Sequence, residues 1–252
     1  MTFENPTFIL ITLVWALCSL PVLIIGVLGI DFSGRLGGET RGPRIPSRWG
    51  WFVMEFPAFT VFPLYYLTQS ERSNVGDLLI VLWITHYTHR TLIWPWVVQR
   101  KSTLFPVITC AAGFGFNILN GLLLGWFLTN IAHYSNDWFF DPRFIAGAAL
   151  FAFGALLNVT SDYRLARMRN RAGGRYVIPR GGAFNLLSTP NLTGEMIEWI
   201  GFALMIWSLP GLAFAMWTIA NLVPRALWRH HWYHETFDDY PENRRAIIPG
   251  LL

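Results

Sequence analysis

Charged side chains are scarce in this sequence, and their scarcity excludes an ordinary soluble fold. Asp, Glu, Lys and Arg make up only 13% of the 252 residues, about half of the usual share, whereas 53% are hydrophobic. The mean hydropathy is +0.38. The 13 Trp and 20 Phe are too many for a soluble core of this size. The composition therefore predicts an all-α polytopic membrane protein, with residues 1–252 forming a single membrane domain.

Cysteines and the common catalytic signatures are also nearly absent. Cys18 and Cys110 both lie in apolar runs, so neither a disulfide framework nor a cysteine metal site is expected. The chain has no CxxC, no HExxH, no P-loop and no Gly-x-Ser-x-Gly. Gly113-Phe-Gly115 lacks the third glycine of a dinucleotide fingerprint, and its place in an apolar run favours helix packing. No basic soluble face is present, so we expect no nucleic-acid partner. The sequence has no Cys/His cluster, so we expect no metal.

Apolar runs divide the chain into seven expected membrane-spanning helices. The run 192–224 is long enough for two passes, and the proline in Ser208-Leu-Pro-Gly211 places a tight turn between them. The first run is too long for a signal-peptide core and is read as a retained helix. The expected spans are 5–30, 49–69, 76–98, 103–130, 143–169, 192–207 and 210–228, followed by a polar and aromatic tail over 229–252.

The basic residues predict the orientation of these spans. Sixteen of the 19 fall in loops on one side, Arg72 and Arg143 lie on the other, and Arg90 is within a span. The positive-inside rule then puts the N-terminus outside or in the lumen and the C-terminus in the cytoplasm. A single lysine accompanies 18 arginines, as is typical of GC-rich coding. This favours a bacterial inner membrane; in a eukaryotic cell we expect the endoplasmic reticulum membrane.

Two of the expected spans, 49–69 and 76–98, carry ionisable side chains within otherwise apolar runs. Such side chains are costly inside a membrane and are functional candidates. Glu55 and the mid-span Tyr87 could hydrogen-bond a carbonyl oxygen of a ligand. Alternatively, Glu55 is a structural partner of Arg90 or of a histidine. His86 and His89 are three residues apart, but no further metal ligand lies near them in the sequence, so a metal site is not favoured. His89 and Arg90 are instead expected to brace Glu55 or other buried polar groups.

Polar side chains recur at helical spacing on both sides of the loop between the fifth and sixth spans. Six arginines lie between them, from Arg164 to Arg180. The positive-inside rule explains these arginines but not the neighbouring amides and acids. Amides and acids hydrogen-bond ribose hydroxyls and carboxamides, and arginines neutralise phosphates, so a nucleotide site is favoured. The two sets that share helix faces are Asn158, Asp162 and Arg169, and Asn191, Glu195 and Glu198.

The polar tail allows two interpretations. Arg225, His230, Tyr233 and Arg244 are suited to a ligand site, but an aromatic, basic segment next to a membrane is also typical of contact with lipid headgroups. The residues alone leave both open.

Seven short motifs, spread over essentially the whole chain, resemble the steroid 5α-reductase (3-oxo-5-alpha-steroid 4-dehydrogenase) family. The C-terminal motifs are the more specific ones. They are Met54-Glu55-x-Pro57, His86-Tyr87-x-His89-Arg90-Thr91, Asn158-x-x-Ser161-Asp162-Tyr163, Tyr176-x-Ile178-Pro179-x-Gly181-Gly182-x-Phe184, Glu195-x-Ile197-Glu198-Trp199-Ile200-Gly201, Trp207-Ser208-Leu209-Pro210 and Phe237-x-Asp239-Tyr240-Pro241.

The resemblance implies a seven-helix membrane enzyme that uses NADPH to reduce the C=C bond of an enone. It implies that Glu55 and Tyr87 bind the 3-keto oxygen of a steroid. Met54 and Arg229 depart from the family pattern, where Gln and His are expected. The cofactor-pocket residues that the resemblance implies are Trp51, Asn158, Asp162, Arg169, Tyr176, Asn191, Glu195, Arg225, Tyr233 and Arg244.

The expected partners are therefore a steroid or sterol-like lipid substrate and membrane lipid. Three alternatives stay open. The chain could reduce another lipid enone, an enoyl-CoA or a polyprenol, or it could be a related membrane methyltransferase that uses S-adenosylmethionine. It could also be a non-enzymatic sterol- or lipid-binding protein or a transporter, although transporters usually show an internal repeat and none is visible.

Overall fold

Helices dominate the computed structural model, which describes residues 5–30, 42–98 and 103–251. Arg35, Arg41, Arg100 and Lys101, four of the basic residues used for the orientation, lie outside this range. The helices are α1 Pro6–Leu17, α2 Ser19–Val27, α3 Ser47–Leu67, α4 Asn74–Tyr87, α5 Trp94–Val97, α6 Val107–Asn130, α7 Pro142–Arg171, α8 Pro190–Ile206 and α9 Leu209–Thr236. Two short antiparallel strands, β1 Arg44–Pro46 and β2 Leu104–Pro106, pair Ile45 with Phe105.

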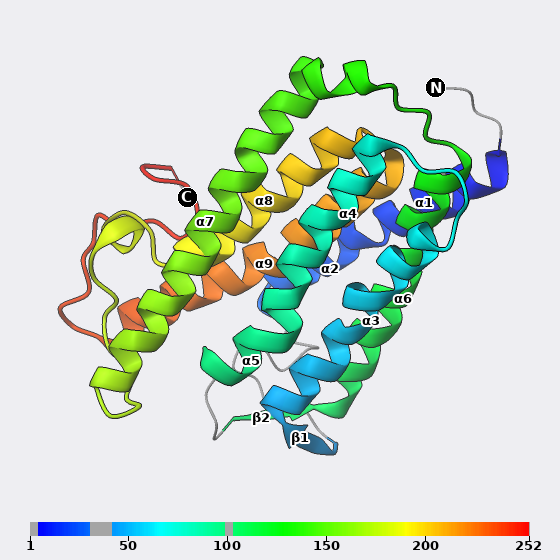
Figure 1. The fold of residues 1–252 in the computed structure, drawn as a ribbon. Helices are drawn as coiled ribbons and strands as arrows, with labels where there is room; N and C mark the ends of the chain where they lie inside the picture. Colours follow the sequence, from blue (N-terminus) through cyan, green and yellow to red (C-terminus); the bar gives the residue numbers. More distant parts are fainter. Residues whose placement is uncertain (1–4, 31–41, 99–102, 252) are drawn as a thin grey trace.

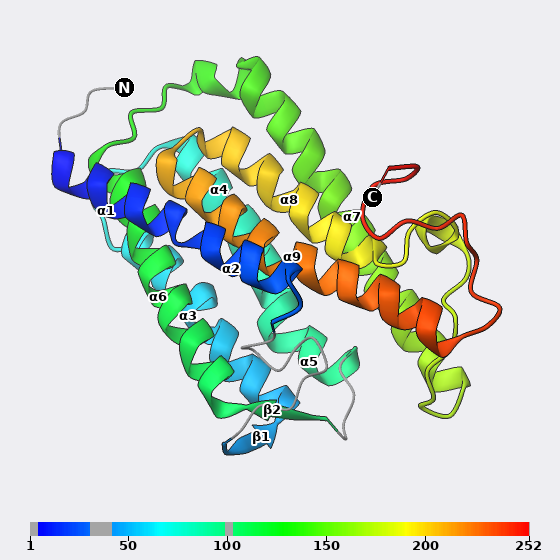
Figure 2. The ribbon, with the colours of Figure 1, turned by 180° about the vertical axis from the view of Figure 1, so that it is seen from behind.

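The all-α prediction is confirmed for the described residues. Within the described residues, three helical segments are long and apolar enough to cross a membrane: Pro6–Val27, Val107–Asn130 and Pro142–Arg171. Figures 1 and 2 show α1 and α2 in line along α9, with α3 beside α6 and α7 beside α8. The chain thus has the composition and the elongated helices of a membrane protein.

Three helix boundaries differ from the expected ranges. The first expected helix, 5–30, is two helices that meet at Cys18. Residues 104–106 of the expected span 103–130 form β2 instead of helix, because they pair with β1. The last helix runs to Thr236, not to 228. Residues 229–236 are polar but contain no Gly or Pro, so the helix continues past the end of the apolar run.

Local sequence explains where several helices begin. The side chains of Asn5, Ser73, Asp141 and Ser208 each accept a hydrogen bond from a backbone N–H in the first turn of the helix that follows. Proline occupies the start of α1, α7 and α8, where its missing N–H costs nothing. The tight turn expected near Ser208 is confirmed, because α8 ends at Ile206 and α9 begins at Leu209.

The expected span 76–98 is not one regular helix. After α4 it widens into a π-helical turn, Thr88–Ile93, before α5. Arg90 and Thr91 are buried in this turn. Such turns are frequent at functional sites, because they shift the register of the side chains on either side.

Helices α7 and α8 touch through their backbones. A Cβ atom on Gly194 would lie 2.5 Å from the backbone nitrogen of Asn158, and one on Gly154 would lie 2.6 Å from the Gly194 oxygen and closer still to the nitrogen of Glu198. Gly147 and Gly201 make the same kind of approach one heptad away. Small residues therefore allow the two helices to pack closely along their length.

The two glycines of the Gly113-Phe-Gly115 segment differ in their surroundings. A Cβ atom on Gly113 would meet the Met54 side chain of α3, so the helix-packing interpretation is confirmed there. A Cβ atom on Gly115 would have no neighbour from another helix within 4 Å among the described residues, so Gly115 makes no such contact.

We expect Gly154→Ala and Gly194→Ala each to destabilise the protein, because the added methyl group meets backbone atoms that cannot rotate away. Overpacking of this kind typically costs about 1–3 kcal/mol. Thermal unfolding in detergent micelles measures the effect. Gly115→Ala is the matched control, since alanine there meets open space and favours helix. Equal melting temperatures for Gly154→Ala and Gly115→Ala would contradict the close contact.

Candidate active site

A cavity of about 480 Å³ lies among α2, α3, α4, α6, α8 and α9. Most of its wall is apolar or aromatic, as suits a lipid-like ligand. A smaller number of polar groups converge on it. The polar and ionisable lining residues are Glu55, His86, Tyr87, Arg90, Thr109, Asn117, Glu195, Thr218, Asn221 and Arg225.

The structure brings Glu55 and Tyr87 to this one cavity, although 32 residues separate them in the chain. Asn117 on α6 donates a hydrogen bond to the Met54 carbonyl at 2.8 Å and approaches Glu55 Oε2 at 3.4 Å. The Tyr87 ring packs against the buried Trp83, with ring centroids 4.8 Å apart. Both side chains are thereby held at the wall of an apolar space.

Arg90 joins the cavity to the polar face of α7 and α8. Its Nη2 lies 3.1 Å from Glu195 Oε2, and its Nη1 lies 3.7 Å from Asp162 Oδ2. Its guanidinium carbon is 4.6 Å from the ring centroids of both Trp51 and Trp94. Two carboxylates and two aromatic faces thus compensate a cation that is only 6% exposed. The bracing role expected for Arg90 is confirmed, with Glu195 and Asp162 as its ion-pair partners.

Asn158 and Asp162 lie behind the cavity walls rather than in them. Asn191 Nδ2 donates to Asp162 Oδ1 at 2.8 Å, and Trp94 Nε1 donates to Asp162 Oδ2 at 2.5 Å. Asn158 Nδ2 donates to the Asn191 backbone oxygen at 2.9 Å. Both α7 side chains are buried, and they line neither this cavity nor the smaller pocket at the end of α7. Asn158 Nδ2 also lies 3.5 Å from Glu195 Oε2, so these contacts orient Asn191 and Glu195, which do line a cavity.

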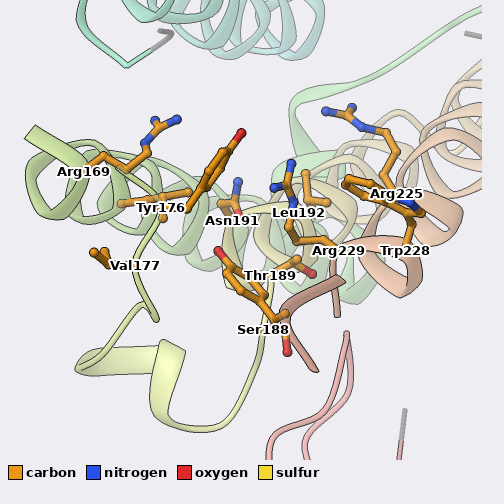
Figure 3. Close-up of a pocket in the computed structure, with 12 residues that line it drawn as sticks. Arg169, Tyr176, Val177, Ser188, Thr189, Asn191, Leu192, Arg225, Trp228 and Arg229 are labelled. Carbon is orange, nitrogen blue, oxygen red and sulfur yellow. The ribbon is translucent and has the colours of Figure 1, made fainter. Parts of the chain in front are cut away.

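A smaller pocket of about 140 Å³ lies where the end of α7, the start of α8 and the end of α9 meet. Figure 3 shows Arg169 and Arg225 on opposite sides of it, with Asn191 between them. Arg169 Nη2 also donates to the Val98 carbonyl at 2.9 Å. Arg225 lines both the pocket and the larger cavity, so the two spaces adjoin at this side chain.

Aromatic and basic side chains surround the pocket. Tyr233 lines it and stacks on Tyr240, with ring centroids 5.1 Å apart and planes at 4°. Tyr233 lies beyond the expected span 210–228, and burial raises the pKa of its hydroxyl to about 12, so the phenol stays a hydrogen-bond donor at neutral pH. The guanidinium carbon of Arg229, a residue that departs from the family pattern, lies 5.9 Å from the centroid of the Tyr176 ring.

Arg244 is buried beside this aromatic stack. Its guanidinium carbon lies 5.1 Å from the Tyr240 ring, and the residue is only 2% exposed. Within the described part of the chain, its Nε and Nη1 atoms have no hydrogen-bond partner. A buried cation with unsatisfied donors is suited to binding an anionic ligand.

The two histidines of α4 and the π-helical turn serve different contacts. His86 Nδ1 lies 2.7 Å from Glu198 Oε1, and His89 Nε2 lies 3.3 Å from the Tyr163 hydroxyl. No group of three or more His, Cys, Asp or Glu side chains within residues 5–30, 42–98 and 103–251 is placed to hold a metal ion. Glu198 therefore joins His86, whereas Asn191 and Glu195 of the same expected helix face turn towards the pocket and the cavity.

Sequence reasoning missed several residues that line the two spaces. Asn117 carries a visible signal, a polar side chain in an apolar run. Trp199 lies in one of the seven family motifs, but neither it nor Trp228 stands out by residue type, because tryptophan in a membrane segment is common and usually marks the interface or the core. Ser188 and Thr189 precede the proline that starts α8, so they read as an ordinary helix start rather than as a pocket wall.

Known proteins similar to this chain share one description. A family model described as 3-oxo-5-alpha-steroid 4-dehydrogenase matches residues 103–252. The 3-oxo-5-alpha-steroid 4-dehydrogenase 1 of Rattus norvegicus is 38% identical over 237 residues, covering 92% of this chain and 90% of the relative. The 3-oxo-5-alpha-steroid 4-dehydrogenase 2 of Sus scrofa is 42% identical over 212 residues, covering 83% and 82%.

A plant relative extends the comparison. Steroid 5-alpha-reductase DET2 of Solanum lycopersicum is 39% identical over 227 residues, covering 88% of this chain and 86% of the relative. The family resemblance drawn from the seven motifs is thereby confirmed, and the expectation of an enzyme with it. The chain belongs to the 3-oxo-5-alpha-steroid 4-dehydrogenase family of oxidoreductases.

Proposed function

We propose that this protein uses NADPH to reduce the C4=C5 double bond of 3-oxo-Δ4 steroids inside a membrane. The observation that carries the proposal is the adjacency of two unlike spaces at Arg225. One is a large, mostly apolar cavity with Glu55 and Tyr87 in its wall, and the other is a pocket lined by arginines. The printed names of the relatives, 3-oxo-5-alpha-steroid 4-dehydrogenase and steroid 5-alpha-reductase, support the same substrate class.

The larger cavity suits the steroid. Phe116, Phe214 and Trp217 offer flat apolar surfaces for its fused rings. Tyr87, with Glu55 beside it, donates a hydrogen bond to the 3-keto oxygen. Negative charge gathers on that oxygen as the double bond is reduced, and a donor already aimed at it typically contributes about 2.7–4 kcal/mol to lowering the barrier.

The smaller pocket and its surroundings suit a nicotinamide dinucleotide phosphate. Arg169, Arg225 and the unsatisfied donors of Arg244 can neutralise phosphate groups. Asn191 can bind the sugar and base together with Tyr176 and Tyr233. Its hydrogen bonds with Asp162 and Asn158 hold it in place. Trp51 and Glu195 line the larger cavity, which supports a position for the reactive end of the cofactor beside the steroid. NADPH bound in this way supplies the hydride that adds to the β-carbon of the enone.

We also propose that the chain crosses the membrane seven times, with the C-terminus in the cytoplasm. The supporting observation is the segregation of its connections. Figures 1 and 2 show the α8–α9 turn and the start of α7 at one end of the helices, and the β1–β2 pair and α5 at the other. Arg44 and Arg48 lie at the second end, and basic residues favour the cytoplasmic side of a membrane. The cytoplasm is also the compartment that supplies NADPH. The arginine-rich composition favours a bacterial inner membrane.

Glu55→Gln and Tyr87→Phe should each lower the kcat/KM for a 3-oxo-Δ4 steroid by about 10²–10³, because Tyr87 is the proposed hydrogen-bond donor to the developing oxyanion and Glu55 supports it. Steady-state NADPH oxidation with progesterone, in detergent micelles, measures this. NADPH affinity should stay within about threefold. Tyr163→Phe and the exposed Glu235→Gln are matched controls outside the cavity. Turnover at the wild-type rate in both cavity variants would contradict the assigned roles.

Arg244→Gln and Arg225→Gln should each weaken NADPH binding about 10- to 100-fold, since a hydrogen bond to a charged group is worth about 1.5–3 kcal/mol. Quenching of tryptophan fluorescence on titration with NADPH measures the dissociation constant. Arg143→Gln is the control: Arg143 pairs with Asp141 at the other end of α7, roughly 39 Å from Arg169 along the helix. Wild-type affinity in Arg244→Gln would rule out its proposed contact with the cofactor.

A further inference from the structure

His86 and Glu198 form a buried pair that the proposed reduction does not yet use. His86 Nδ1 lies 2.7 Å from Glu198 Oε1, and the side chains are 8% and 1% exposed. The His86 ring packs edge-on against Trp199 at 4.6 Å and against the neighbouring Tyr87 ring at 5.0 Å. These contacts fix the imidazole next to the phenol, and His86 lines the larger cavity.

Glu198 contacts His86 through its Oε1 atom. Its Oε2 atom is buried and, within the described residues, has no hydrogen-bond partner. Nearly every buried carboxylate oxygen in proteins is hydrogen-bonded, and an exception calls for an explanation. A carboxylate that accepts from Nδ1–H fixes the tautomer of the ring and stabilises the imidazolium. The proton that His86 can give up is then the one on Nε2.

The reaction requires such a proton. Once a hydride has added to the β-carbon of the enone, the α-carbon must take a proton, and the donor must lie beside the group that holds the carbonyl oxygen. Among the ionisable residues that line the cavity, Glu55 and Tyr87 are placed at the oxygen, Glu195 is ion-paired with Arg90, and arginines do not release protons. His86 remains, adjacent to Tyr87 in the chain and in space.

The geometry points to His86 as the catalytic acid that protonates the α-carbon, with Glu198 as its positioning residue; this step rests on the proposed enone reduction by NADPH. The hydride supplies two electrons to the β-carbon, and the pair of the C=C bond moves towards the carbonyl oxygen. That enolate pair then forms the C–H bond at the α-carbon while the Nε2–H bond of the imidazolium breaks. The neutral imidazole regains its proton from water.

The test compares His86→Gln with His89→Gln. Both lose an imidazole from the same stretch of chain, but His89 contacts Tyr163 and does not line the cavity. General acid catalysis contributes about 10²–10⁴ in rate, so the kcat of His86→Gln should fall by that factor with progesterone and NADPH, while that of His89→Gln stays within about threefold. The KM for progesterone and the NADPH dissociation constant should change less than about threefold in both.

Isotopes separate proton donation from a merely structural role. In His86→Gln the kinetic isotope effect from NADPH deuterated at nicotinamide C4 should fall towards one, and the solvent isotope effect in D2O should rise, because proton transfer limits the rate. Glu198→Gln should show the same two shifts with a smaller loss of kcat, since its amide oxygen still accepts from Nδ1–H but carries no charge. It also serves as the test if His86→Gln does not fold.

The outcomes are distinct. Wild-type protein that oxidises no NADPH with progesterone overturns the proposed function itself. If the wild-type protein turns over but both isotope effects are unchanged in His86→Gln and in Glu198→Gln, only the role of this pair is overturned, even if the kcat of the variants falls. Selective loss in His86→Gln with the two isotope shifts supports it.

Discussion

The close backbone contact between α7 and α8 is the constraint on which the rest of the structure depends. Gly154 and Gly194 let the two helices approach until a side chain at either position would meet backbone atoms. At that separation the side chains of Asn158 and Asp162 reach Asn191 directly. A wider spacing would leave buried amides and a carboxylate without partners, which is costly in a membrane interior.

A division of labour follows among the buried polar side chains. Asp162 and Asn158 hold other residues in place, whereas Glu195 and Asn191 present their side chains to the cavity and the pocket. Arg90 connects the two groups, because the π-helical turn that carries it directs its guanidinium between two carboxylates and two tryptophan rings. The same turn follows directly after Tyr87, so the proposed substrate-binding and cofactor-binding sides share one local feature of the backbone.

Sequence reasoning predicted the helices better than the contacts between them. Apolar runs located most of the helices, and the proline after Ser208 located the turn between α8 and α9, because these signals are local. The end of α9 at Thr236 was missed because polarity shows where an apolar run stops, not where backbone hydrogen bonding stops. The π-helical turn was missed because its sequence, Thr88–Ile93, contains no Gly or Pro to mark an irregular backbone.

For the site, periodicity placed Asn191, Glu195 and Glu198 on one face of a helix, but their partners lie on other helices. Glu198 meets His86 across 112 residues, and Glu195 meets Arg90 across 105. Such pairings depend on how helices cross, which no local pattern records. The family motifs named the same side chains without revealing which line a cavity and which stand behind it.

The central proposal is that the two spaces that adjoin at Arg225 bring a nicotinamide and a steroid enone into direct contact. Reaction with NADPH carrying two deuterium atoms at nicotinamide C4, followed by mass and NMR spectra of the reduced steroid, measures this most directly. We expect one deuterium, located at the β-carbon (C5), in every molecule of product. A reduced steroid without deuterium, or with the label at the α-carbon, would contradict direct hydride transfer in this cavity.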